Sequence, residues 1–144
     1  MDTQSYANHR QFVPMFHRVL VPVLALTVIG SLVNLYLSLG DHQRLYSASL
    51  IAVLSMGILT LALLSRIFAL KAQDRAIRAE ENLRHFVLTG KLPDPRLTVR
   101  QIVALRFAPD NEFVALARRA ADDNLAPDAI KREVKQWRPD THRV

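Results

Sequence analysis

The chain has 144 residues, no cysteine and a formal net charge of +6, because 19 Lys and Arg residues outnumber 13 Asp and Glu residues. The missing thiol excludes disulfides, cysteine nucleophiles and thiolate metal sites. A pI near 10.3 invites a nucleic-acid interpretation, but sixteen of the basic residues follow residue 65, and no recognition module or basic stripe interleaved with aromatics is present. We therefore expect no nucleic acid partner.

The first 18 residues are polar and then amphipathic. Aromatic and apolar side chains recur there at helical spacing, and Pro14 lies near the expected bend into a membrane. This pattern predicts an N-terminal interfacial segment over residues 1–18. His9 and His17 lack acidic or cysteine partners, so we expect no metal and no cofactor at this end of the chain.

Two apolar stretches follow, at residues 19–39 and 46–65, separated by a polar hexapeptide. Each stretch lacks charge and supplies roughly the 20 residues that a helix needs to cross a hydrocarbon core. The short connector predicts an antiparallel return, so residues 19–65 form a transmembrane helical hairpin whose first partner is the lipid bilayer. The connector holds one basic residue, Arg44, whereas basic residues cluster after the second span, and the positive-inside rule then places both termini in the cytoplasm.

Small and polar side chains line one face of each predicted span. The residues expected to pack inside the membrane are Thr27, Gly30, Ser31, Asn34 and Ser38 on the first span and Ala48, Ala52 and Ser55 on the second. Asn34 matters most, because an amide in hydrocarbon requires a protein or water partner. Packing within the hairpin or against another subunit is the favoured interpretation, and a water-lined pore in a self-assembled ring is the alternative.

Residues 66–89 lack Gly and Pro and are rich in helix formers, which predicts that the second helix continues into the cytoplasm as a helical extension. Contacts with the membrane surface, including anionic lipid, or with a partner are expected from Arg66, Lys71, Arg75 and Arg78.

Two ion pairs between residues four apart are expected along this extension. They join Asp74 to Arg78 and Glu80 to Arg84. The larger apolar residues keep no clean heptad, so we expect no long self-paired coiled coil.

A linker rich in proline, residues 90–97, leads to a predicted cytoplasmic helical subdomain over residues 98–144. Thr98 and Gln101 fit a capping box, Asp110 is expected to cap a second helix that Asn124 ends, and Pro127 begins a third. The expected core of this tail comprises Ile102, Phe107, Phe113, Leu116, Ile130, Val134 and Trp137, the last three on the third helix. The fold class is therefore all-α: a transmembrane hairpin, an extended second helix and a small C-terminal bundle of about three short helices.

Several separated segments resemble, in order, an uncharacterised family of small bacterial two-span membrane proteins, a domain of unknown function. They are Tyr6-Ala-Asn-His-Arg10 with Phe12-Val-Pro14, the stretch from Phe68 to Arg78, the stretch from Gln101 to Ala108, and residues Ile130–Asp140. The resemblance covers nearly the whole chain. It implies a multi-pass protein of the bacterial inner membrane, and it brings no activity, ligand or catalytic residue.

No constellation of nucleophile, base or paired carboxylates is visible, so we expect no enzyme. The favoured function is that of a non-catalytic accessory or structural subunit, which anchors and docks within a larger bacterial membrane protein complex beside other membrane subunits. A homo-oligomeric channel or transporter-like pore is the alternative.

Overall fold

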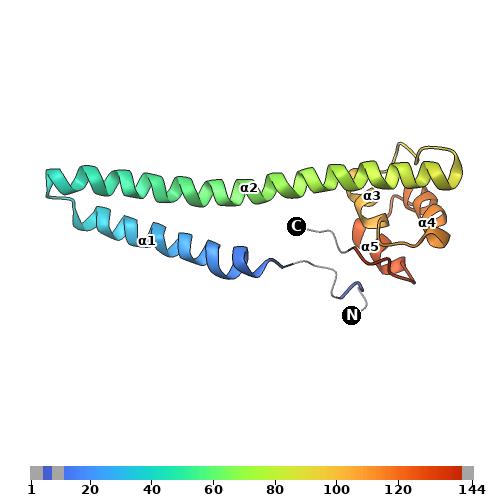
Figure 1. The fold of residues 1–144 in the computed structure, drawn as a ribbon, viewed down its shortest axis with the longest axis horizontal. Helices are drawn as coiled ribbons and strands as arrows, with labels where there is room; N and C mark the ends of the chain where they lie inside the picture. Colours follow the sequence, from blue (N-terminus) through green and yellow to red (C-terminus); the bar gives the residue numbers. More distant parts are fainter. Residues whose placement is uncertain (1–4, 8–11, 141–144) are drawn as a thin grey trace. The chain divides into compact units, whose positions relative to one another are not determined.

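The computed structural model describes residues 5–7 and 12–140. Residues 1–4, 8–11 and 141–144 lie outside the described residues, and so does that part of the predicted interfacial segment 1–18. All regular secondary structure in the described ranges is helical, which confirms the all-α class. The elements are a π-helix η1 (Met15–Leu20), followed by α1 (Val21–Leu37), α2 (His42–Thr89), α3 (Val99–Leu105), α4 (Asp110–Asp122) and α5 (Pro127–Glu133) (Figure 1).

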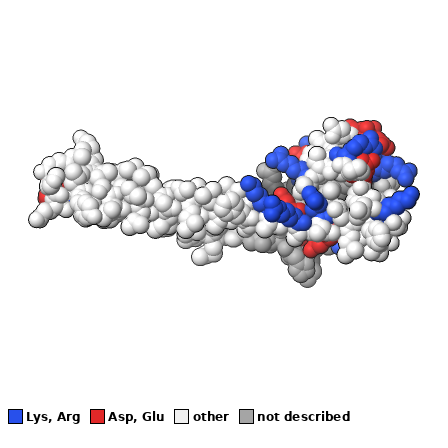
Figure 2. Space-filling model, turned by 90° about the horizontal axis from the view of Figure 1, so that it is seen from above, with Lys and Arg blue, Asp and Glu red and all other residues white. Residues whose placement is uncertain are grey.

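The described residues form two compact units that α2 joins along the chain. We call residues 12–69 the hairpin unit, and the described residues among 1–11 and 70–144 the tail unit. The first part of α2 therefore belongs to the hairpin unit and its last part, from residue 70, to the tail unit. Figure 2 shows that Lys and Arg side chains gather on the tail unit, whereas the visible surface of the hairpin unit is almost free of charge.

Two helical stretches, Met15–Leu37 and His42–Thr89, are long and apolar enough to cross a membrane. Pro22 is the second residue of α1 and directly follows η1, so it lies inside one helical stretch, where the π-helical turns give way to α-helical ones. The apolar side chains of both helices are largely exposed within the chain itself, including Leu26, Val33 and Leu61. Such a surface is typical of helices that contact something other than water.

The turn between α1 and α2 is shorter than the polar hexapeptide suggested. The second helix begins at His42 rather than Tyr46, because Asp41 caps it. Its Oδ1 accepts hydrogen bonds from the backbone N–H groups of Gln43 and Arg44, at 3.1 and 3.2 Å. Asp is a preferred N-cap residue, so three polar residues after it enter the first turn of the helix.

Helix α2 then continues without a break to Thr89, as its composition predicted. Gly90 follows with φ of +72°, a left-handed conformation that glycine adopts without steric cost, and its N–H donates to Phe86 O at 2.7 Å. A glycine in this position ends the helix and lets the chain turn toward α3.

Helices α3 to α5 pack around one apolar cluster in the tail unit. The predicted capping box is present, since Thr98 Oγ1 accepts from Gln101 N and the Gln101 side chain accepts from Thr98 N. Asn124 has φ of +46° after α4, and Pro127 opens α5, as predicted. The buried cluster includes Ile102, Phe107, Phe113, Leu116, Ile130 and Val134, with Trp137 packed against it.

Two details of the tail differ from the sequence prediction. Asp110 is the first residue of α4 and makes no capping hydrogen bond; Pro109 occupies the cap position. Helix α5 ends at Glu133, so Val134 and Trp137 approach the core from non-helical backbone. The Trp137 ring packs at a tilt on the Phe107 ring, with the ring centroids 4.6 Å apart, so this segment reaches the core without a further helical turn.

Candidate functional site

The small and polar face of the hairpin unit is the first candidate site, and one contact joins its two helices. Ser31 Oγ and Ser55 Oγ lie 2.8 Å apart, and both side chains are buried. Because each hydroxyl has one proton, one serine donates to the other, and the accepting serine donates to a carbonyl of its own helix, either Ser31 to Val28 O or Ser55 to Ala52 O. Ala48 and Ala52 are 1 and 2% exposed, so small side chains let the two backbones approach closely.

The predicted face of small and polar side chains on α1 is partly buried and partly exposed. Ser31 and Ser38 are buried, and Ser38 Oγ donates to Asn34 O at 2.8 Å. Thr27, Gly30 and Asn34 are exposed. Successive residues are turned by about 100° around the helix axis, so this face is wider than one helix contact, and α2 covers only the edge that carries the two serines.

The two polar side chains on the exposed edge differ in their hydrogen bonding. Thr27 Oγ1 donates to Val23 O at 2.8 Å, so its own helix satisfies it. The Asn34 amide makes no hydrogen bond within the described part of the chain. No atom lies within 4 Å of a Cβ built on Gly30, so this edge is open. An uncovered amide beside a glycine is suited to accept a second helix.

The basic residues predicted to contact a membrane surface form the second candidate site. Lys71, Arg75 and Arg78 are exposed, and none forms an ion pair with another described residue. Arg66 is half-buried, with its guanidinium 5.9 Å from the centroid of the Phe16 ring. Unpaired exposed cations leave this part of α2 able to bind anionic groups.

A buried ion-pair cluster in the tail unit was missed by sequence reasoning. Arg84 pairs with Glu81, at 2.9 Å, and with Asp110, at 2.6 Å, rather than with Glu80. Its Nη2 also donates to Ala108 O, and its guanidinium lies 4.3 Å from the Phe113 ring centroid. Residues three and four apart on a helix are equally near, so the spacing alone could not decide between Glu80 and Glu81. The predicted pair of Asp74 with Arg78 is likewise absent from the described ion pairs.

A cleft of about 480 Å³ lies beside this cluster. Its lining consists of Arg84, Pro109, Asp110, Gln136, Trp137 and Arg138. Both arginines already contact carboxylates, because Arg138 Nη1 lies 3.4 Å from Glu81 Oε1. The charges therefore hold the end of α2 against α4 and the C-terminal segment, and this arrangement is that of a structural clamp.

A second set of ion pairs joins the linker to the end of α4. Arg96 contacts Asp94 at 2.7 Å and Asp122 at 2.8 Å. The hydrogen bonds from Arg96 lower the pKa of Asp94 from 3.8 to about 2, and the two carboxylates raise the pKa of Arg96. Among the described residues no group of three or more His, Asp or Glu side chains is arranged to hold a metal ion.

The fold and these surfaces define an all-helical protein in which two helices, long and apolar enough to span a membrane, precede a compact charged tail. The model of a family of unknown function, DUF6526, matches residues 1–144, and the chain belongs to this family. No match was found among curated proteins or among solved structures.

Proposed function

We propose that this chain is a non-catalytic accessory or structural subunit of a bacterial inner-membrane complex, anchored by the hairpin unit and docked through exposed surfaces of its helices. The observation that carries the proposal is Asn34, an exposed amide without a hydrogen-bond partner among the described residues, in the last turn of the apolar helix α1. Inserted in lipid, that amide requires a partner, and another membrane subunit supplies one.

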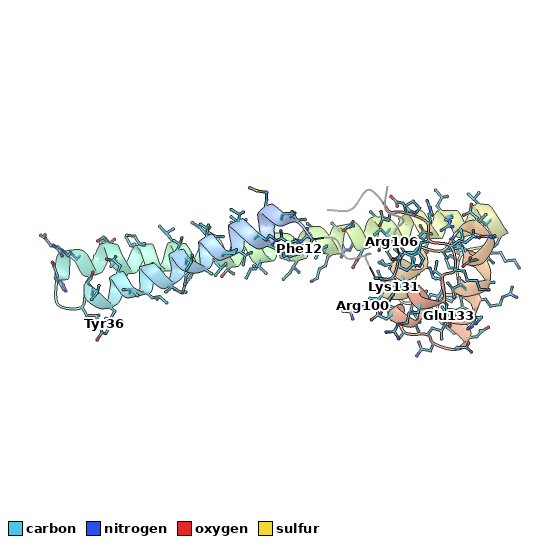
Figure 3. The ribbon with its side chains drawn as sticks, turned by 90° about the horizontal axis from the view of Figure 1, so that it is seen from below. Phe12, Tyr36, Arg100, Arg106, Lys131 and Glu133 are labelled. Atoms are coloured by element: carbon cyan, nitrogen blue, oxygen red, sulfur yellow. The ribbon has the colours of Figure 1, made fainter. Side chains whose placement is uncertain are left out.

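Aromatic residues support the proposed placement in the bilayer. Tyr36 and Tyr46 are 72 and 71% exposed and flank the turn between α1 and α2 (Figure 3 labels Tyr36). Phe16 and Arg66 lie at the opposite end of the hairpin unit. Aromatic rings concentrate at membrane interfaces, so these residues mark the two boundaries of the span.

The unpaired cations support the proposed orientation. Lys71, Arg75 and Arg78 follow the apolar part of α2, whereas the turn between the helices carries only Arg44, itself paired with Asp41 at 3.2 Å. Cytoplasmic flanks of bacterial spans are enriched in Lys and Arg, and anionic headgroups attract such residues. We therefore place both termini in the cytoplasm and the turn outside.

Native purification tests the role as a subunit. The tagged full-length protein is extracted from its own membranes in mild detergent, and the mass and composition of what comes with it are determined. We expect a heteromeric assembly of fixed stoichiometry. Asn34→Val should remove the co-purifying membrane subunit, because the amide loses its hydrogen bonds to that partner.

Thr27→Val is the matched control, since it is isosteric on the same edge and its hydroxyl is already satisfied by Val23 O. It should leave the assembly intact. Recovery of this chain alone, with no other protein, would contradict the proposal and bring the pore forward. In that case Asn34→Leu should change conductance of the reconstituted protein.

A further inference from the structure

One face of α2 in the tail unit is exposed although its spacing is that of a helix–helix interface. The residues on it are Ala72, Ala76, Ala79, Leu83 and Phe86, at intervals of four, three, four and three. All five are exposed, and Leu83 and Phe86 are 63 and 50% accessible. This alternation is the 3.5-residue repeat of positions a and d in a coiled coil.

The structure explains why the larger apolar residues alone concealed this repeat. Ile77 is buried, and Glu81 and Arg84 form the clamp, so these residues belong to the face that packs on the tail. Without Ile77, the exposed apolar residues keep one repeat, in which alanine fills three of the five a and d positions. Small side chains at such positions allow two helix backbones to approach closely.

The charges beside this face identify its occupant. With Ala76 and Leu83 at position a, Arg75 takes position g and Glu80 position e of the following heptad. In a parallel pair, g of one helix lies next to that e of the other, so each Arg75 meets a Glu80 of the second copy. Neither residue forms an ion pair with any other described residue of its own chain.

We propose that α2 binds a second copy of this chain in parallel, through Ala72, Ala76, Ala79, Leu83 and Phe86, with reciprocal Arg75–Glu80 pairs fixing the register. Two copies inserted with the same topology present α2 in the same direction, and this step rests on the proposed membrane insertion. Two heptads are too few for a stable free coiled coil, but anchoring in one bilayer raises the effective concentration of the two helices.

Disulfide cross-linking in native membranes tests the proposal, because the full-length chain has no cysteine of its own. Ala76→Cys and Ala79→Cys place thiols at neighbouring a and d positions. Arg78→Cys is the matched control, since Arg78 is exposed on the same turn but lies outside the repeat. We expect covalent dimers from the first two variants under mild oxidation, at a yield about tenfold above the control.

Exchange of the charges tests the register. Arg75→Glu in the Ala76→Cys background places a carboxylate next to each Glu80 of the other copy and should lower the dimer yield by about tenfold, and the double change Arg75→Glu with Glu80→Arg should restore it. Equal cross-linking of Ala76→Cys and Arg78→Cys would overturn the proposal, as would a double variant no better than the single one.

These results are separable from the role as a subunit. A heteromeric complex whose Ala76→Cys variant fails to cross-link refutes parallel pairing and leaves the subunit proposal standing. A cross-linked dimer that purifies without any other protein supports the pairing and refutes the subunit proposal.

Discussion

Two adjacent glutamates of α2 give the sharpest test of the tail structure. Glu81 is buried, with its side chain 6% exposed and its carboxylate paired with Arg84 and Arg138, whereas Glu80 is exposed. Glu81→Gln removes the charge that compensates Arg84, which itself is only 12% exposed. Breaking a buried pair costs about 3–5 kcal/mol, and we expect about 3 kcal/mol because Arg84 keeps Asp110.

Hydrogen exchange of the full-length protein in detergent micelles measures this cost. A loss of about 3 kcal/mol raises the opening equilibrium of the tail about a hundredfold, so the protected amides of α3 should exchange about a hundredfold faster in Glu81→Gln. Glu80→Gln, next along the chain and equal in charge, should leave them unchanged. Equal protection in the two variants would refute the assignment of the clamp to Glu81.

Three further predictions concern the core, acid stability and topology. Phe107→Ala should destabilise the tail by about 3–5 kcal/mol, since Phe107 is fully buried and packs against Trp137. Trp137 is the one tryptophan of the chain, so its fluorescence reports unfolding of the tail in urea. The ion pair of Asp94 with Arg96 should stabilise the tail above pH 3.8, and this stabilisation should be lost as the pH falls through about 2. Titration of the Asp94 carboxyl by NMR should show a midpoint at about 2, and Arg96→Gln should return the pKa of Asp94 toward 3.8. Gln43→Cys should react with an impermeant maleimide on intact cells and Lys91→Cys only after lysis; the reverse pattern would contradict the proposed orientation.

Local patterns were sufficient for the helices and several of their ends. The two long apolar stretches, the capping box at Thr98, the left-handed Asn124 and the start of α5 at Pro127 each depend on residues close in the sequence. Hydropathy, capping and proline geometry act within a few residues, so the sequence by itself determined these features.

Only the tertiary structure decided which of several equivalent local choices was made. Arg84 could reach Glu80 or Glu81, and the position of Asp110 selects Glu81. The C-terminal segment could have continued α5, but packing of the half-buried Trp137 against Phe107 favours non-helical backbone after Glu133.

The two exposed surfaces depend on the same kind of long-range choice. The small and polar face of α1 could have been covered entirely, yet contact with α2 leaves Asn34 open, and packing of Ile77 on the tail leaves Ala76 and Leu83 exposed on the other side of α2. A helix can present each face to only one neighbour, and the neighbours come from residues distant in sequence. The sequence therefore determined the helices, whereas tertiary packing determined which of their faces remain available to a partner.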